Sequence, residues 1–209
     1  MRARMGYRPA VGARTNWLIP LAVVGALCAP SGCTLARREV MLVLTTDVDC
    51  TVLDRFEVSL RRGSAQSDIV WSRKYLRNDC PAVGESLPRA PLARGNGVDP
   101  GVAYRLGVVD ARRTDERVHI EVVGFRADGT RVMATAAETD FVDGQVYAVP
   151  VELTSVCLSA LVCPANYVCR RDPSGGAGCG SVYRSPGTLG TFAAPSALRV
   201  TDTAVLDED

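Results

Sequence analysis

Residues 118–132 read VHIEVVGFRADGTRV, and this stretch decides the fold class. Apolar and polar residues alternate from Val118 to Val122, which is the pattern of a β-strand with one buried face. Asp128-Gly129 then stands between two apolar flanks, and this dipeptide is a strong signal for a hairpin turn. The stretch therefore predicts two antiparallel strands.

Segments of the same kind occur on both sides of this stretch. The other candidate strands are residues 40–44, 55–61, 69–75 and 104–108. A last hairpin is expected to pair residues 132–141 with 146–149 through Asp143-Gly144. Seven or eight short strands at this spacing predict an all-β domain, an antiparallel β-sandwich, over residues 39–154.

A Cys-rich module is expected over residues 155–180, which are too few to bury a core without cross-links. Its four cysteines, with the spacing C-x5-C-x5-C-x9-C, are Cys157, Cys163, Cys169 and Cys179. A zinc site is the alternative, but no C-x-x-C pair is present and the only histidine is about 38 residues away. We expect disulfides, and among three connectivities we favour Cys157 with Cys169 and Cys163 with Cys179.

Cys50 and Cys80 form the remaining predicted pair. By closing the loop between them, their disulfide would stabilise the folded state by about 3 kcal/mol. Cys80 would also tether the Pro- and Gly-rich residues 78–101, a long loop that we expect to form the contact surface. Residues 181–209 are rich in Gly, Pro, Ser, Thr and Ala and are expected to form a disordered tail.

The N-terminal residues have the pattern of a secretory signal peptide. Four Arg occur in residues 1–16 and an apolar run follows at residues 17–27, which is short for a membrane-spanning helix. Ser31-Gly32-Cys33 resembles the end of a bacterial lipobox, although Pro30 departs from the usual aliphatic residue. We expect acylation at Cys33.

In this interpretation residues 1–32 are a removed signal peptide and residues 33–38 a lipidated linker. The alternatives are cleavage after Ala26 and an uncleaved N-terminal anchor. Cysteine parity does not separate the two cleavage sites, because one leaves six cysteines for disulfides and the other leaves eight.

Charge and motif content exclude several classes of function. The formal net charge is +1, but the chain from Cys33 onward has 20 basic and 23 acidic residues, which is unlike a nucleic-acid-binding protein. His119 is placed on the polar face of its strand and lacks partners for a catalytic triad. Asp47, Asp49 and Asp54 could offer oxygen ligands to calcium, but their spacing is not that of an EF-hand. We predict no catalytic residue, no metal ion and no cofactor.

A resemblance to a known group rests on two further segments. Residues 141–153 read FVDGQVYAVPVEL and residues 163–169 read CPANYVC. Together with the imperfect lipobox, they resemble uncharacterised envelope lipoproteins of high-GC Gram-negative bacteria, over residues 17–180. The resemblance implies a small immunoglobulin- or transthyretin-like sandwich with a short Cys-rich knob, and it brings no catalytic residues.

The expected function is that of an exported, lipid-anchored envelope protein acting as a non-catalytic binding or structural module. It would lie in the outer membrane, facing the periplasm or the surface, or be secreted if Cys33 is not acylated. The expected partners are the membrane, through the acyl anchor, and an envelope protein or glycan, with no nucleic acid. The alternative is a secreted hydrolase or carbohydrate-active enzyme using loop carboxylates, such as Asp110 with Asp115 or Glu116, in a cleft.

Overall fold

The computed structural model describes residues 38–81, 86–94, 103–112, 116–158, 161–191 and 202–206. These residues are mostly β-strand, which confirms the all-β prediction, and the two helical segments are single 3₁₀ turns, η1 (Ser155–Cys157) and η2 (Pro186–Thr188). No helix in these ranges is long and apolar enough to cross a membrane.

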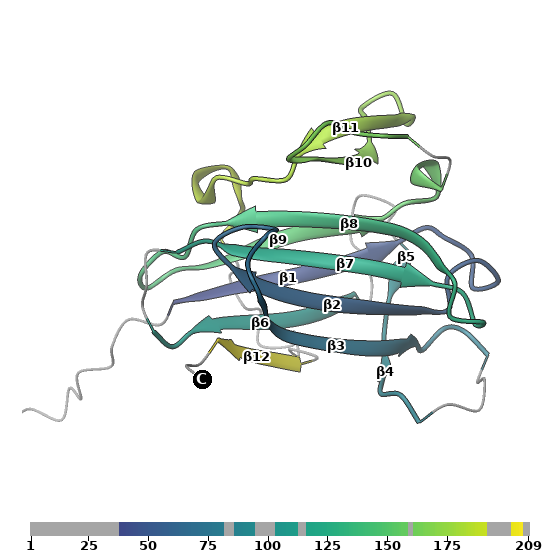
Figure 1. Cartoon of the computed structure of the whole chain (residues 1–209), viewed down its shortest axis with the longest axis horizontal. Coiled ribbons are helices and arrows are strands. Elements are labelled where there is room, and N and C mark those ends of the chain that lie inside the picture. Colours follow the sequence, from purple (N-terminus) through teal and green to yellow (C-terminus); the bar gives the residue numbers. More distant parts are fainter. Residues whose placement is uncertain are drawn as a thin grey trace, which may run out of the picture. The chain divides into compact units, whose positions relative to one another are not determined.

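The first sheet is built around the apolar strand β1. Its members are β1 (Glu39–Thr46), β5 (Ala93–Arg94), β6 (Tyr104–Asp110), β9 (Val146–Leu153) and β12 (Asp202–Leu206). Strand β1 pairs with β6 in antiparallel and with β9 and β5 in parallel orientation, and β12 adds to β6 in parallel. The sheet is therefore mixed, and the expectation of purely antiparallel pairing is wrong here (Figure 1).

The second sheet has the order β4-β3-β2-β7-β8. Its members are β2 (Arg55–Arg62), β3 (Ile69–Arg77), β4 (Arg89–Ala90), β7 (Val118–Phe125) and β8 (Arg131–Thr139). All pairs except β3 with β4 are antiparallel. The hairpin predicted around Asp128-Gly129 is confirmed as β7–β8, and Gly129 has a φ of 84°, a left-handed conformation that suits glycine.

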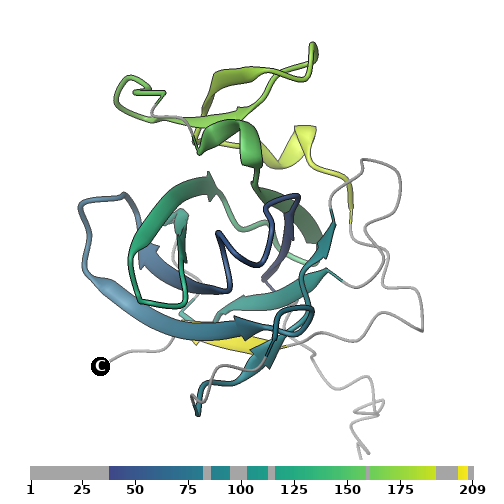
Figure 2. The same ribbon diagram turned by 90° about the vertical axis from the view of Figure 1, so that its right-hand side faces the viewer.

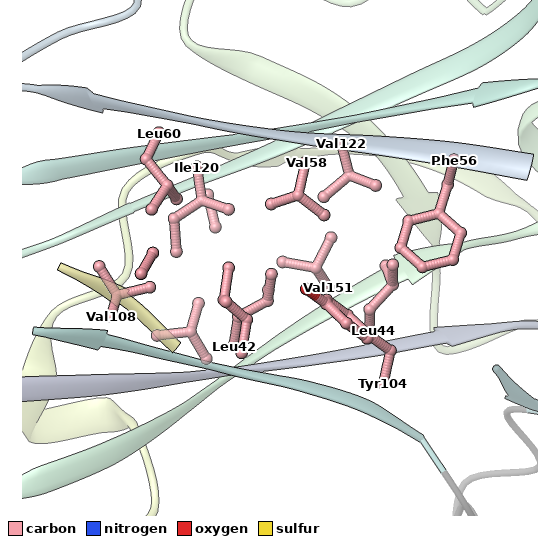
Figure 3. Packing of buried hydrophobic residues seen from close by; sticks show 14 of the residues in the cluster. Leu42, Leu44, Phe56, Val58, Leu60, Tyr104, Val108, Ile120, Val122 and Val151 are labelled. Carbon is pink, nitrogen blue, oxygen red and sulfur yellow. The ribbon is translucent and has the colours of Figure 1, made fainter. Parts of the chain in front are cut away.

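One hydrophobic core receives side chains from both sheets. Alternate residues of β2 and β7, among them Phe56, Val58 and Ile120, meet Leu42 and Leu44 of β1 (Figure 3). All five are fully buried. The alternation seen in the sequence therefore identifies the inward faces of these strands, and the opposite face of β2 and β7 remains free to carry polar groups.

The last predicted hairpin is wrong, because β9 does not pair with β8. Strand β9 crosses to the first sheet, where Val149 lies opposite Leu42 of β1. Arg38 holds this crossing at the start of β1, since its guanidinium binds the carbonyl oxygen of Phe141 (3.4 Å) and the Asp143 carboxylate (3.2 Å). Asp143-Gly144 does form a turn, but β9 continues into the first sheet because its core-facing residues align with those of β1.

Residues 78–101 are not a loop throughout, which corrects the prediction. Strand β4 pairs with β3 in the second sheet and β5 pairs with β1 in the first, so residues 89–94 connect the two sheets. Residues 82–85 and 95–101 of the expected contact surface lie outside the described residues.

The disordered tail expected at residues 181–209 is corrected for residues 181–191 and 202–206, whereas residues 192–201 and 207–209 lie outside the described residues. Strand β12 lies along β6 with Ala204 and Leu206 buried, and residues 181–191 pack against β8 and β9 through single bridges at Tyr183 and Thr191. Arg38, expected to end the linker, is 8% exposed and belongs to the folded part.

Candidate functional site

The Cys-rich module, with the segment that follows it, approaches the outer face of the second sheet (Figure 2). The approach leaves a cleft of about 500 Å³, which we call the β7–β8 cleft. Its sheet side includes Arg61, His119, Glu121, Ala134, Ala136 and Glu138. Its other side includes Ala165, Asn166 and Val168 of the module and Val182 of the segment that follows. The cleft therefore combines residues from β2, β7, β8 and the C-terminal part of the chain.

Strand register determines the order of the polar groups on the sheet side. Arg61 of β2, His119 of β7 and Glu138 of β8 lie opposite one another in one row across three strands. Nδ1 of His119 lies 2.9 Å from Oε1 of Glu138, and Nη2 of Arg61 donates to Oε2 of Glu121 at 3.2 Å. Each carboxylate in the cleft thus has a partner that can carry positive charge.

Small side chains make the floor of the cleft. Ala136 lies opposite Glu121, and Ala134 lies opposite Val123, on the same face of β8 as Glu138. Because an alanine extends only one carbon from the sheet, the polar groups of β2 and β7 stand above this floor. A larger residue at either alanine position would fill the cleft.

The described residues contain three disulfides, and all three match the predicted pairs: Cys50–Cys80, Cys157–Cys169 and Cys163–Cys179. The last two cross-link η1, β10 (Tyr167–Arg171) and β11 (Ala177–Ser181) within the Cys-rich module. Cys157 also packs against the main core. The module is therefore internally fixed and its first turn is anchored on the sheets.

A carboxylate at the end of β1 also ties the module to the sheets. Asp47 accepts hydrogen bonds from the backbone N–H of Ser155 (2.6 Å) and from its hydroxyl (2.7 Å). The same carboxylate binds Arg171 of β10, and Arg171 also donates to the Thr154 hydroxyl at 3.0 Å.

The module contributes one turn to the cleft. The N–H of Tyr167 donates to the carbonyl of Pro164 (3.1 Å), which places Ala165 and Asn166 at the tip. Asn166 has a φ of 63°, a left-handed conformation that asparagine tolerates better than most residues. The sequence at this turn therefore suits the conformation that brings Asn166 to the cleft.

The chain after the module continues along the edge of β8. The N–H of Glu138 donates to the carbonyl of Val182 (2.9 Å), and the N–H of Arg184 donates to the carbonyl of Glu138 (2.7 Å). The hydroxyl of Tyr183 donates to Asp140 at 2.6 Å, which raises the pKa of Tyr183, and Arg117 stacks on its ring. These contacts hold the segment after the module against β8, where Val182 and Glu138 line the cleft.

The acids singled out in the sequence do not converge. Asp47 binds the module, Asp49 accepts from the N–H of Thr51 (3.0 Å), and Asp54 pairs with Arg55 (3.2 Å). Cys50, Cys80 and Asp79 lie close enough for a metal site, but both sulfurs belong to the disulfide.

The carboxylate pair named for an enzyme is not found as expected. Asp110 is buried and forms ion pairs with Arg38 (3.4 Å) and Arg62 (3.2 Å), so it is a structural group. Glu116 is exposed, and Asp115 lies outside the described residues, as does Cys33. The two carboxylates that do share a cleft are Glu121 and Glu138.

Sequence reasoning placed His119 correctly on the polar face of β7 but missed the site around it. His119 is 4% exposed, and Ala165, Asn166 and Val168 of the Cys-rich module, with Val182 after it, line the cleft on that face. One signal was available, since a register centred on Asp128-Gly129 places His119 opposite Glu138. No comparable sequence pattern predicted that the Cys-rich module and Val182 would lie over this face.

No protein-family model, curated protein or solved structure matches this chain.

Proposed function

We propose that this chain is an exported, lipid-anchored protein of the cell envelope that acts as a non-catalytic binding module. The scaffold is a β-sandwich of the two mixed sheets, in the immunoglobulin- or transthyretin-like class. Acylated Cys33 would hold it in the outer membrane, facing the periplasm or the surface. Three disulfides support export, because such cross-links persist in oxidising compartments.

The β7–β8 cleft carries this proposal and replaces residues 78–101 as the proposed contact surface. Its volume of about 500 Å³ is in the range of small-ligand sites. Disulfides, strand register and ion pairs fix its walls before a ligand arrives, which lowers the entropy lost on binding.

The chemistry of the cleft favours a neutral, polyhydroxylated ligand such as an envelope glycan. Gln66 and Asn166 offer amide donors and acceptors, and Glu121 and Glu138 offer carboxylate oxygens. Hydroxyl groups both donate and accept, so one sugar can satisfy both kinds of partner. An envelope protein that inserts a polar loop is the second partner class.

Binding is tested by filling the cleft. We expect titration of the full chain with envelope glycans, followed by NMR or calorimetry, to show binding that Ala136→Trp abolishes. Ala127→Trp is the matched control, because Ala127 lies in the exposed hairpin turn. Equal binding by both variants would place the contact surface elsewhere.

Anchoring is tested by the mass of the membrane-extracted protein. We expect an acylated N-terminal Cys33, and Cys33→Ser should move the protein to the soluble fraction while Cys28→Ser should not. A soluble wild-type product beginning at Leu27 would show cleavage after Ala26 and refute lipidation.

One observation favours the alternative, a secreted hydrolase or carbohydrate-active enzyme. Glu121 and Glu138 line the same cleft, and paired carboxylates perform glycoside hydrolysis. Both carboxylates are already bound by Arg61 and His119, so we place binding first. Release of reducing sugar by the wild type, lost in both Glu121→Gln and Glu138→Gln, would establish the enzyme instead.

A further inference from the structure

A second, smaller cavity of about 220 Å³ lies on the other side of β8 from the β7–β8 cleft. Three arginines line it, Arg170 and Arg171 from β10 and Arg184 from the segment after the module. The cavity is also lined by Ala136 of β8 and by Pro150 and Glu152 of β9. We call this cavity the arginine pocket.

Two of the three arginines have no carboxylate partner among the described residues. Arg171 pairs with Asp47, whereas Arg170 donates only to the backbone carbonyl of Ser181. Nε of Arg184 is buried and makes no hydrogen bond within the described ranges. No other side-chain hydrogen bond or ion pair of Arg184 occurs among the described residues, so its guanidinium, which lines the pocket, holds donor capacity that the described part of the chain does not use.

The two unpaired guanidiniums also repel each other. Burial lowers the pKa of Arg170 to about 10, and the neighbouring charge of Arg184 contributes to this shift. Burial lowers the pKa of Arg184 as well. Like charges in a half-buried site are unfavourable unless an anion is present, so bound negative charge would relieve both effects.

The local sequence gives Arg170 room to lie flat against the β10–β11 hairpin. A Cβ atom on Gly180 would lie 2.7–2.8 Å from Cδ, Cζ and Nε of Arg170, so any side chain at that position would displace this guanidinium. Glycine at 180 and the carbonyl of Ser181 therefore position this guanidinium at the pocket.

We propose that the arginine pocket binds a small oxyanion, the phosphate or sulfate group of a monoester or the free ion. The planar fork of a guanidinium matches such oxygens in bidentate geometry. The volume is below the range of drug-sized ligands, which suits one anionic group. Glu152 opposes the anion from the β9 side and limits its affinity.

The site is independent of the proposed glycan cleft, although Thr135 and Ala136 border both cavities. A sugar phosphate and the same sugar without phosphate therefore separate the two proposals. Binding of the phosphate alone supports the pocket whether or not the uncharged sugar binds in the cleft.

The experiment is calorimetric titration of the full chain with inorganic phosphate, sulfate and a sugar phosphate at constant ionic strength. We expect Arg184→Gln and Arg170→Gln each to weaken binding by about tenfold or more. Arg126→Gln removes the same charge from the exposed hairpin turn and should change affinity less than about twofold. Circular dichroism checks that each variant is folded.

Two further variants test the geometry without removing an arginine. Gly180→Ala should displace Arg170 and weaken phosphate binding several-fold, and Glu152→Gln should strengthen it. The proposal is overturned if wild type binds none of the three anions, or if Arg126→Gln weakens binding as much as Arg184→Gln. The first result would show that the pocket does not bind anions. The second would show that anions are attracted only by the overall positive charge of the surface.

Discussion

Arg77 is a cation buried in the fold, with a side chain that is 2% exposed. Its Nη1 donates to the carbonyls of Val48 and Leu53, both at 2.8 Å, and its Nε and Nη2 bind Asp79 at 3.0 and 2.7 Å. The side chain therefore fixes the loop between β1 and β2, which the Cys50–Cys80 disulfide also holds.

We expect Arg77→Ala to lower the free energy of unfolding by about 3 kcal/mol or more, because it leaves two buried carbonyls without donors. Denaturant unfolding measures the change. Lys74→Ala is the control, since this lysine is on the same strand, is 53% exposed and makes only surface contacts, an ion pair with Glu57 and a contact with the Phe125 ring, among the described residues. It should cost less than about 1 kcal/mol. Equal losses of unfolding free energy in the two variants would contradict the structural role of Arg77.

Glu152 makes stability depend on pH. Burial and the nearby Asp47 raise the pKa of its carboxyl, while Arg171 opposes the shift in part. Arg170 and Arg184 line the same pocket. A raised carboxyl pKa means that the folded state holds the proton more tightly, so this contribution to stability is lost as pH rises through the folded pKa.

We therefore expect Glu152→Gln to be more stable than wild type at pH 7 and to lose that advantage toward pH 4. Thermal unfolding at several pH values measures the difference. Glu116→Gln removes an exposed carboxylate, so its stability relative to wild type should stay constant over the same pH range. A constant advantage for Glu152→Gln would show that the effect is not linked to this ionisation.

At the scale of elements, local patterns predicted strands well and strand partners less well. Alternation located β2 and β7, because one face of each strand meets the core. Asp128-Gly129 predicted the right hairpin, whereas Asp143-Gly144 predicted the wrong one. A turn dipeptide reports a local reversal of the chain, but the pairing of β9 with β1 depends on core residues about 100 positions apart.

Strand β12 was missed for the same reason. Five residues with two inward apolar side chains carry a weak signal, and a parallel edge strand has no adjoining turn to mark it. Its partners are also distant in sequence: Asp202 binds Arg73 at 2.9 Å and accepts from the Tyr75 hydroxyl, and the carbonyl of Leu206 accepts from Arg62.

We expect a chain ending at Thr201 to lose about 3 kcal/mol or more of stability. The deletion exposes the edge of β6, removes the buried side chains of Ala204 and Leu206, and leaves Arg62 without one acceptor. A chain ending at Leu206 keeps β12 and should match wild type. If both truncations unfold at the wild-type denaturant concentration, β12 contributes nothing to the fold.

At the scale of the whole molecule, both candidate binding sites depend on how the Cys-rich module is held. Arg170 and Arg171 of the arginine pocket and Asn166 of the β7–β8 cleft belong to the module. Cysteine spacing and the expected oxidising compartment predicted the disulfides of the module. The cleft could not be predicted, because Asp47 and Ser155 are 108 residues apart and no local sequence pattern links them.

Asp47→Ala should loosen the module without unfolding the sheets. The substitution removes the acceptor of both Ser155 hydrogen bonds and of Arg171, while the disulfides keep the module itself intact. We expect a loss of about 1–3 kcal/mol, typical of hydrogen bonds to a charged group. Amide hydrogen exchange should become faster in η1 and β10 and remain unchanged in β1 and β2.

Because both sites have a wall on the module, Asp47→Ala should weaken glycan and phosphate binding together, whereas Arg184→Gln should affect phosphate alone. Asp128→Ala is the matched control, since Asp128 also accepts a backbone N–H bond, from Thr130 at 2.8 Å, but in the hairpin turn. Unchanged exchange in η1 and β10 of Asp47→Ala would show that core packing of Cys157 holds the module instead. In that case both sites should keep their wild-type affinity.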